Sequence, residues 1–458
     1  MSQSSLPVVI IGAGPVGLSA AAHAMSRSLT LVVLEAGPRV ADGVRRWGHV
    51  RVFSPWSLNV DPVAADMLTR RGWTMPPGGE YPTGRELVEQ YLEPLAGLPE
   101  LSPHIRLRSR VVTVTKLHHD RMKDAARQEA PFLVRVLGPD GEEDILSRAV
   151  IDASGTIDTP GVLGASGVPA LGEEAARARI FYGIPDVLGN DRGRYAGRRV
   201  LVVGSGHSAL NALLDLARLA EDDPATRVRW AIRRRTLGQL LGGPRKDQLE
   251  ERGKLGTSVR ALLEGGRVEL VTGFHITRVS GSPGGLVVSS ADRQLPPVDE
   301  IVAATGFRPD WSILSELRLD LDPAVESPRA LAPLIDPNVH SCGTVPPHGA
   351  EELKQPEDNL FVVGMKSYGR APTFLMRTGY EQVRSVISAI AGDWEAARRV
   401  ELVLPETGVC STDRSDAAAA SCCGTSAETP IAIPVAGLAV STSRAGSPQG
   451  RVQDTGCC

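Results

Sequence analysis

The sequence is poor in cysteine and in aromatic residues, and it has no large excess of either charge. Its 458 residues include six cysteines, 4% aromatic residues and a net charge of −3. A small disulfide-stapled secreted domain is therefore excluded, and reduced thiols are expected. The charge balance gives no electrostatic basis for binding nucleic acid or an anionic membrane surface. The few aromatic residues also disfavour a platform on which bases could stack.

Long hydrophobic runs are also missing. No run of about 18 purely apolar residues occurs, so a membrane span is not expected. The apolar stretch from Leu6 to Ala24 is interrupted by Gly12, Gly14, Pro15 and Gly17, and no Lys or Arg precedes it. Because a secretory signal has a basic start and a continuous apolar centre, we expect a cytoplasmic protein. The length indicates about two to three domains.

The N-terminal segment has the pattern of a dinucleotide-binding turn. PVVIIGAGPVGLSAAAHAM predicts an apolar strand, a turn with Gly12, Gly14 and Gly17, and an alanine-rich helix. The first glycine allows the tight turn, the second lets a pyrophosphate approach the backbone, and the third allows close helix packing. The phosphates would lie at the helix N-terminus, where free N–H groups favour anions. The next strand, LTLVVLEAG, leads to Glu35, which would accept hydrogen bonds from a ribose 2′-hydroxyl.

The same pattern occurs again in GRRVLVVGSGHSALNALLDLA. Gly204 and Gly206 occupy the first two glycine positions, and Ala209 stands at the third, where a small residue is tolerated. Ser208 lies in the same turn and is a further cofactor-binding candidate.

The strand after the second turn, TRVRWAIRRRTL, leads to Arg233, Arg234 and Arg235 rather than to an acid. Guanidinium groups at this point would pair with a ribose 2′-phosphate, which an acid would repel. NADPH is therefore favoured over NADH for the second turn, whereas a first turn that leads to Glu35 is typical of FAD.

Two such turns predict an α/β fold with an FAD-binding Rossmann-like domain, an inserted NAD(P)H-binding Rossmann-like domain and a disordered C-terminal tail. The chain is expected to leave the first domain near AVIDASGT and to return near EIVAATGFRPD. A helix from about Thr378 would then point its N-terminus at the flavin. The predicted parts are 1–157 (FAD, first part), 158–297 (NADPH), 298–404 (FAD, second part) and 405–458 (tail).

The motifs GAGPVG, GSGHSA and ATGF, in this order, resemble those of two-dinucleotide-binding-domain flavoproteins. Together with VRVFSPWSLNVDP and YPTGRELVEQYLEPLA, they resemble more narrowly the class B flavin-dependent monooxygenases, from about Val8 to Asp393. The resemblance implies FAD and NADPH as cofactors and a peroxyflavin that passes oxygen to a soft nucleophile or a carbonyl. It also implies that Asn59, with Ser54 and Trp56 as neighbours, lies beside the flavin C4a position. The alternative is that Asn59 is a turn residue.

Two features depart from the related families. The class B signature carries a His before the second turn, and IFYGIPDVLGNDRGRYAG has none. The related disulfide reductases place a redox cysteine pair after the second strand or in the nicotinamide domain, and neither region contains cysteine here. A conventional disulfide reductase is therefore disfavoured.

The paired tail cysteines and GMKSYGRAPTF also resemble flavoproteins encoded in arsenic-resistance gene clusters, which implies a metalloid such as trivalent arsenic as substrate.

Four of the six cysteines form two adjacent pairs in a polar tail. The apolar periodicity ends after about Pro405, and such a composition is expected to be disordered. Soft thiolates select soft ions, so the pairs would chelate a metal or metalloid. The alternative is that they have no function. The candidate ligands are Cys422, Cys423, Cys457 and Cys458, with Cys410 as a further thiol.

The remaining cysteine, Cys342, lies between His340 and His348 in NVHSCGTVPPHG. The spacing matches no standard zinc site. Cys342 is a candidate catalytic thiol, and the alternative is a buried, inert residue.

The main prediction is an FAD-dependent, NADPH-consuming monooxygenase that acts on a small molecule or metalloid with O2 as co-substrate. One alternative is an NADPH-dependent thiol or metal reductase, in which the tail cysteine pairs carry electrons and O2 is unnecessary. The other is a non-catalytic flavoprotein that carries a metal or metalloid and oxidises negligible NADPH. No nucleic-acid or membrane partner is expected, and a homodimer is left open.

Overall fold

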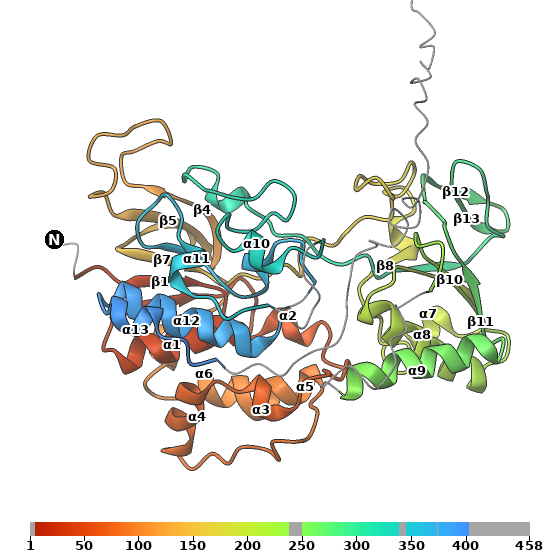
Figure 1. The fold of residues 1–458 in the computed structure, drawn as a ribbon, viewed down its shortest axis with the longest axis horizontal. Coiled ribbons are helices and arrows are strands. Elements are labelled where there is room, and N and C mark those ends of the chain that lie inside the picture. The colour runs from red at the N-terminus through yellow and green to blue at the C-terminus, as the bar shows by residue number, and fades with distance from the viewer. Residues whose placement is uncertain (1–4, 238–249, 339–344, 373, 403–458) are drawn as a thin grey trace, which may run out of the picture. The chain divides into compact units, whose positions relative to one another are not determined.

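The computed structural model describes residues 5–237, 250–338, 345–372 and 374–402. Two five-stranded parallel sheets dominate this part of the chain (Figure 1), as the α/β prediction required. All six cysteines lie outside the described residues, and so does the tail predicted from 405. The strand order of the first sheet is β15 (Leu360–Val362), β7 (Ala149–Asp152), β1 (Val8–Ile11), β2 (Leu31–Leu34) and β3 (Ile105–Arg106).

The second sheet is formed by the middle of the chain. The sequence analysis assigned 158–297 to the inserted domain, but Glu300–Ala303 pairs in parallel with Val200–Val203. The second sheet therefore extends past residue 297. Its strand order is β11 (Val268–Val271), β10 (Arg227–Ala231), β9 (Arg199–Val203), β14 (Glu300–Ala303) and β8 (Ile180–Tyr182).

The two segments that connect the sheets pair with each other. The N–H of Gly161 donates to the carbonyl of Gly306 at 2.7 Å, and the N–H of Arg308 donates to the carbonyl of Thr159 at 2.8 Å. The Thr305 hydroxyl adds a bond of 2.6 Å to the carbonyl of Gly161. The chain therefore leaves the first sheet and returns to it through one antiparallel pair of segments, which satisfies the backbone polar groups of both.

Side chains of β1 alternate between the two faces of the first sheet, as the two-residue period of a strand requires. Val9 and Ile11 pack with Val134 and Val136 of an antiparallel sheet on one face. That sheet is formed by β4 (Arg110–Lys116), β5 (Phe132–Gly138) and β6 (Gly141–Ser147).

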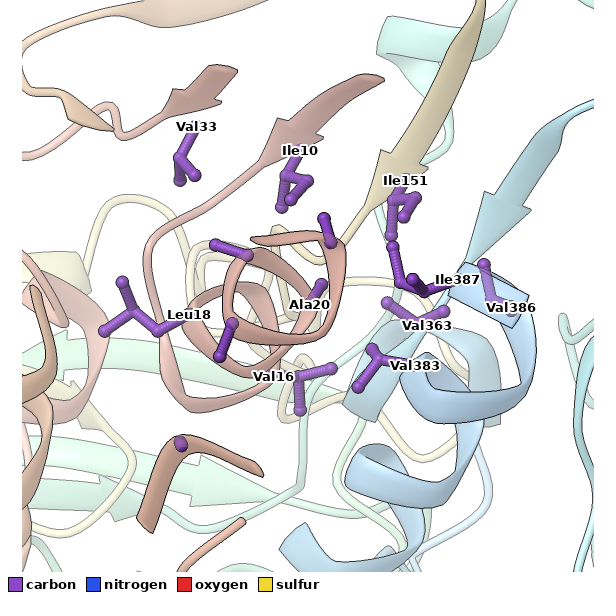
Figure 2. Close-up of a cluster of buried hydrophobic side chains, with 14 of the residues drawn as sticks. Ile10, Val16, Leu18, Ala20, Val33, Ile151, Val363, Val383, Val386 and Ile387 are labelled. Atoms are coloured by element: carbon purple, nitrogen blue, oxygen red, sulfur yellow. The ribbon is translucent and has the colours of Figure 1, made fainter. Parts of the chain in front are cut away.

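The opposite face of the first sheet is covered by helices α1 (Pro15–Ser26) and α12 (Met376–Ile390). In Figure 2, Val16 of α1 lies beside Val383 of α12, and Ile10 and Ile151 point at the same cluster. The helix expected from about Thr378 thus begins at Met376. This packing places the start of α1 and the start of α12 near one another, because Cβ atoms built on Gly379 and Gly364 would both contact Val16.

The second sheet packs against α8 (His207–Asp222), which buries Leu213 and Leu216 together with Val200 and Val202 of β9. No described helix is long and apolar enough to cross a membrane. The remaining helices are α2 (Asp42–Arg45), α3 (Trp56–Asn59), α4 (Pro62–Thr69), α5 (Gly84–Leu87), α6 (Glu93–Ala96), α7 (Arg192–Tyr195), α9 (Glu250–Glu264), α10 (Ala332–Ile335), α11 (Ala350–Leu353) and α13 (Trp394–Arg398), and a hairpin is formed by β12 (Arg278–Ser282) and β13 (Gly285–Ser289).

Candidate functional site

The first glycine turn has the geometry of a phosphate cradle. Gly12 has a φ of +96°, and a Cβ there would lie 2.8 Å from the carbonyl oxygen of Ala153. A Cβ on Gly17 would lie 1.9 Å from the carbonyl oxygen of Gly12, whereas a Cβ on Gly14 would meet nothing within 4 Å. Gly14 is the N-cap of α1 and no side chain caps this end. The free N–H groups of α1 therefore border open space, which fits the pyrophosphate of a dinucleotide.

Glu35 lies directly beside this turn. One carboxylate oxygen accepts from the N–H of Ala13 and the other from the N–H of Gly37, each at 2.8 Å. Both bonds fix the orientation of the carboxylate at the end of β2. Each oxygen keeps a further lone pair, so Glu35 can still accept a hydrogen bond from a ribose hydroxyl.

The second turn repeats this arrangement at the start of α8. Gly204 has a φ of +125°, and a Cβ there would lie 2.2 Å from the carbonyl oxygen of Ala304. A Cβ on Gly206 would meet nothing within 4 Å, and Ala209 is fully buried at the third position. Gly206 is the N-cap of α8 without a side-chain cap, and half-buried Ser208 follows in the first turn of that helix. A second pyrophosphate therefore fits here.

The arginines after β10 lie where the strand prediction put them. Arg233 is exposed and donates to the carbonyl of Ala165 over a long 3.4 Å contact. Arg234 is half-buried and its carbonyl accepts the N–H of Gly273 at 2.7 Å. The exposed guanidinium of Arg233 can therefore exchange its weak contact for a charged phosphate.

Asn59 is enclosed by protein atoms, with 0% of its surface exposed. Its amide nitrogen donates to the carbonyls of Ser54 at 2.7 Å and Pro55 at 3.0 Å, and its amide oxygen accepts from the Ser54 hydroxyl at 2.7 Å. Both N–H groups of the amide are thus used within residues 54–59. In this arrangement Asn59 fixes a turn, and direct contact with a cofactor would require the turn to open.

A cavity of about 430 Å³ borders the same turn. It combines two aromatic rings, from Trp56 and Tyr81, with charged groups from residues that include Arg51 and Glu86. Its size and mixed lining are suited to a small polar molecule.

Asp61, two residues beyond Asn59, is the buried N-cap of α4. One carboxylate oxygen accepts from the N–H of Ala64 at 2.9 Å, and the other lies 3.1 Å from Nε2 of His23. Burial raises the pKa of Asp61, but the hydrogen bonds and charge of His23 and the Ala64 N–H outweigh it, so the pKa lies below the ordinary value. The sequence contained a signal for this cap, since Asp before Pro marks a helix start.

The lowered pKa of Asp61 predicts a pH-dependent contribution to stability. A carboxylate with a depressed folded pKa stabilises the protein above its unfolded pKa, and this contribution is lost as pH falls through the folded value. We expect Asp61→Asn to lower the free energy of unfolding by about 1–3 kcal/mol at pH 7. The difference between wild type and variant should shrink below about pH 4. Urea unfolding at a series of pH values would measure it, and a pH-independent difference would contradict the assignment.

The residues after β15 hold a buried ion pair. Nζ of Lys366 lies 2.5 Å from Asp152 and 3.2 Å from the Ser154 hydroxyl, and Lys366 is 1% exposed. Asp152 ends β7, where the chain leaves the first sheet. The ion pair therefore links the end of β7 to the segment after β15.

His348 is buried, and both of its ring nitrogens have partners. Nδ1 lies 3.1 Å from the carbonyl of Pro346, and Nε2 lies 2.9 Å from the amide nitrogen of Gln382. Nδ1 must therefore carry the hydrogen, and burial lowers the pKa of the ring. Both nitrogens are unavailable to a metal, and His340 and Cys342 lie outside the described residues. Within the described residues, no group of three or more His, Cys, Asp or Glu could hold a metal ion. The tail ligands Cys422, Cys423, Cys457 and Cys458 also lie outside them.

Residues 9–328 match the model of the pyridine nucleotide-disulphide oxidoreductase family, and the chain belongs to this family. The sequence is 28% identical over 231 residues to the indole-3-pyruvate monooxygenase YUCCA6 of Arabidopsis thaliana, covering 49% of the chain and 48% of that protein. It is 26% identical over 322 residues to a ferredoxin–NADP reductase of Saccharopolyspora erythraea, covering 69% of the chain and 77% of that protein. The match covers about half the length of YUCCA6 and of the indole-3-pyruvate monooxygenase YUCCA1 of Oryza sativa.

The fold is similar to that of the bacillithiol disulfide reductase of Bacillus cereus, with a TM-score of 0.62 at 19% identity. That likeness covers 84% of the chain and 99% of the reductase. The two glycine turns and the family together identify a flavoprotein oxidoreductase that uses FAD and NADP(H), and the cofactor prediction is confirmed.

Proposed function

We propose that the chain is an NADPH-dependent flavoprotein monooxygenase that transfers one oxygen atom of O2 to a small soft nucleophile, with a trivalent metalloid such as arsenite as a substrate. The observation that carries this proposal is the absence of cysteine before Cys342. Both glycine turns and both strands after them lie in that part of the chain, so a redox dithiol beside the flavin is missing there. The similarity to indole-3-pyruvate monooxygenases supports the same reaction class.

The chain itself would bind and orient the cofactors. Backbone N–H groups at Gly14 and Gly206 would hold the two pyrophosphates, because both positions border open space. A bound flavin would supply hydride acceptance from NADPH and activation of O2. One oxygen atom would pass to the substrate and the other would leave as water, with both electrons of NADPH consumed. The residues proposed to hold FAD are Gly12, Gly14, Gly17 and Glu35, and those for NADPH are Gly204, Gly206, Ser208, Arg233 and Arg234.

A second candidate is an NADPH-dependent thiol or metal reductase that uses the tail cysteines. The two adjacent cysteine pairs of the tail favour it, since adjacent thiolates can hold one thiophilic centre or carry electrons. In this scheme O2 is unnecessary and the tail pairs are essential for turnover.

Anaerobic stopped-flow of the FAD-loaded protein separates the two candidates. NADPH is expected to reduce the flavin, and mixing with oxygenated buffer should give a transient absorbing species before the oxidised spectrum returns. Arsenite should shorten the lifetime of that species and yield arsenate. A matched variant with Cys422, Cys423, Cys457 and Cys458 changed to Ser should behave as wild type. Direct return of oxidised flavin, combined with loss of turnover in the four-cysteine variant, would contradict the monooxygenase and support the reductase.

A further inference from the structure

We infer that Tyr380 is a positioning residue for flavin reduction, which it supports by fixing residues 53–59 against the second glycine turn. The inference rests on the proposed transfer of hydride from NADPH to FAD. Its basis is two buried tyrosine hydroxyls, of which one accepts the N–H of Asp61 and the other donates to the carbonyl of Asn59 at the end of this loop.

The two hydroxyls are buried, and each has a backbone hydrogen-bond partner. Tyr380 is 2% exposed, and its hydroxyl donates to the carbonyl oxygen of Asn59 at 2.8 Å. The hydroxyl oxygen of Tyr91, which is 0% exposed, accepts the N–H of Asp61 at 3.1 Å. The hydroxyls of Tyr91 and Tyr380 are close enough for each to influence the pKa of the other. Of these two side chains, only Tyr380 donates to the carbonyl of Asn59.

This arrangement of hydroxyls is suited to positioning and not to proton transfer. Its link to Asp61 is a backbone N–H, which does not act as an acid at neutral pH. Burial raises the pKa of Tyr91 and of Tyr380 far above the ordinary tyrosine value. Both hydroxyls therefore remain protonated, and their contribution is to hold the loop in one conformation.

The anchored loop presents an aromatic ring to the second glycine turn. The side-chain amide of Asn59 closes the loop onto itself, and Phe53 lies at its start. The centroid of the Phe53 ring is 5.3 Å from that of His207, with the planes tilted by 43°. His207 is the first residue of α8 and directly follows Gly206, whose backbone borders open space. A shift of Asn59 would therefore move Phe53 relative to the turn that is proposed to hold NADPH.

The first test is the rate of flavin reduction in Tyr380→Phe, measured anaerobically at saturating NADPH. We expect this rate to fall about ten- to a hundredfold, because small misplacements of reacting groups have effects of that size. The FAD content should stay the same. The matched control is Tyr182→Phe, which removes a tyrosine hydrogen bond of 2.7 Å to Glu173 and leaves the loop intact. Its reduction rate should stay close to that of wild type.

The second test does not depend on activity. The N–H groups of Trp56 and Ser57 donate to the carbonyls of Glu80 and Gly78 at 2.8 and 3.1 Å. Loss of the Tyr380 anchor should therefore increase hydrogen exchange of residues 51–59 in the FAD-loaded protein. Phe53→Leu should lower the reduction rate without this change in exchange. Because both variants act through the same ring, the double variant should be no slower than the slower single variant.

Unchanged exchange at residues 51–59 together with a wild-type reduction rate would overturn the inference. An equal rate loss in Tyr182→Phe would also overturn it, because the effect would then be general destabilisation. If NADPH fails to reduce the wild-type flavin, the proposed function fails. The exchange measurement then decides by itself whether Tyr380 holds the loop.

Discussion

Gly204→Ala is expected to destabilise the inserted domain by about 3 kcal/mol or more and to abolish NADP+ binding. The backbone of Gly204 has a φ of +125°, and a Cβ there would lie 2.2 Å from the carbonyl oxygen of Ala304. An alanine is therefore disfavoured by its backbone conformation and also collides with Ala304, which directly follows β14 and cannot move without disturbing the pairing of β14 with β9. Thermal unfolding should show a midpoint lower by about 5–10 °C.

Gly206→Ala is the matched control, two residues along the same turn. A Cβ on Gly206 would meet nothing within 4 Å, so the thermal midpoint should be unchanged. The methyl group would occupy the space proposed for the pyrophosphate. The dissociation constant for NADP+ should therefore rise about tenfold or more, as expected for loss of one hydrogen bond to a charged group. Wild-type affinity in Gly206→Ala would show that the nucleotide does not use this space.

Arg127→Ala is expected to lower the free energy of unfolding by about 3–5 kcal/mol. Arg127 lies in the long loop between β4 and β5, and its guanidinium donates twice to one oxygen of Glu357, at 2.6 and 2.9 Å. The side chains are 2% and 0% exposed. Removing the arginine leaves a buried carboxylate whose remaining donor is the N–H of Arg318 at 3.0 Å. Urea unfolding would measure the loss.

Two variants show whether burial is the cause. Arg135→Ala removes a pair with Asp144 of good geometry, at 2.8 and 2.9 Å, but this pair is exposed. Its loss should hardly change the urea midpoint, because water and salt already screen the charges. The double variant Arg127→Met, Glu357→Leu should recover most of the stability lost in Arg127→Ala, since no unpaired charge remains. A similar loss in Arg127→Ala and Arg135→Ala would contradict this explanation.

The two glycine turns could be predicted from the sequence because each is formed by residues that are close together in the chain. A strand, three small residues and a helix start lie within about 20 residues, and their backbone geometry follows from glycine and from the free N–H groups of the helix. The structure places Gly14 and Gly206 at open space and packs Gly17 and Ala209 closely, as the spacing predicted. Glu35 likewise lies at its turn because β2 is the parallel neighbour of β1.

Only the tertiary structure showed which residues Asn59 contacts and which sheet β14 joins. Asn59 and Tyr380 are 321 residues apart, and their hydrogen bond exists because α12 packs against α1 and reaches the turn before α4. No local pattern indicates which tyrosine meets which carbonyl. Strand 300–303 likewise lies directly before the return to the first sheet, and its apolar sequence suits either parallel sheet. Its pairing with β9 decided which one it joined. Turns formed by residues close together in the chain could therefore be predicted from the sequence. Contacts between distant elements could not, because they depend on how those elements pack.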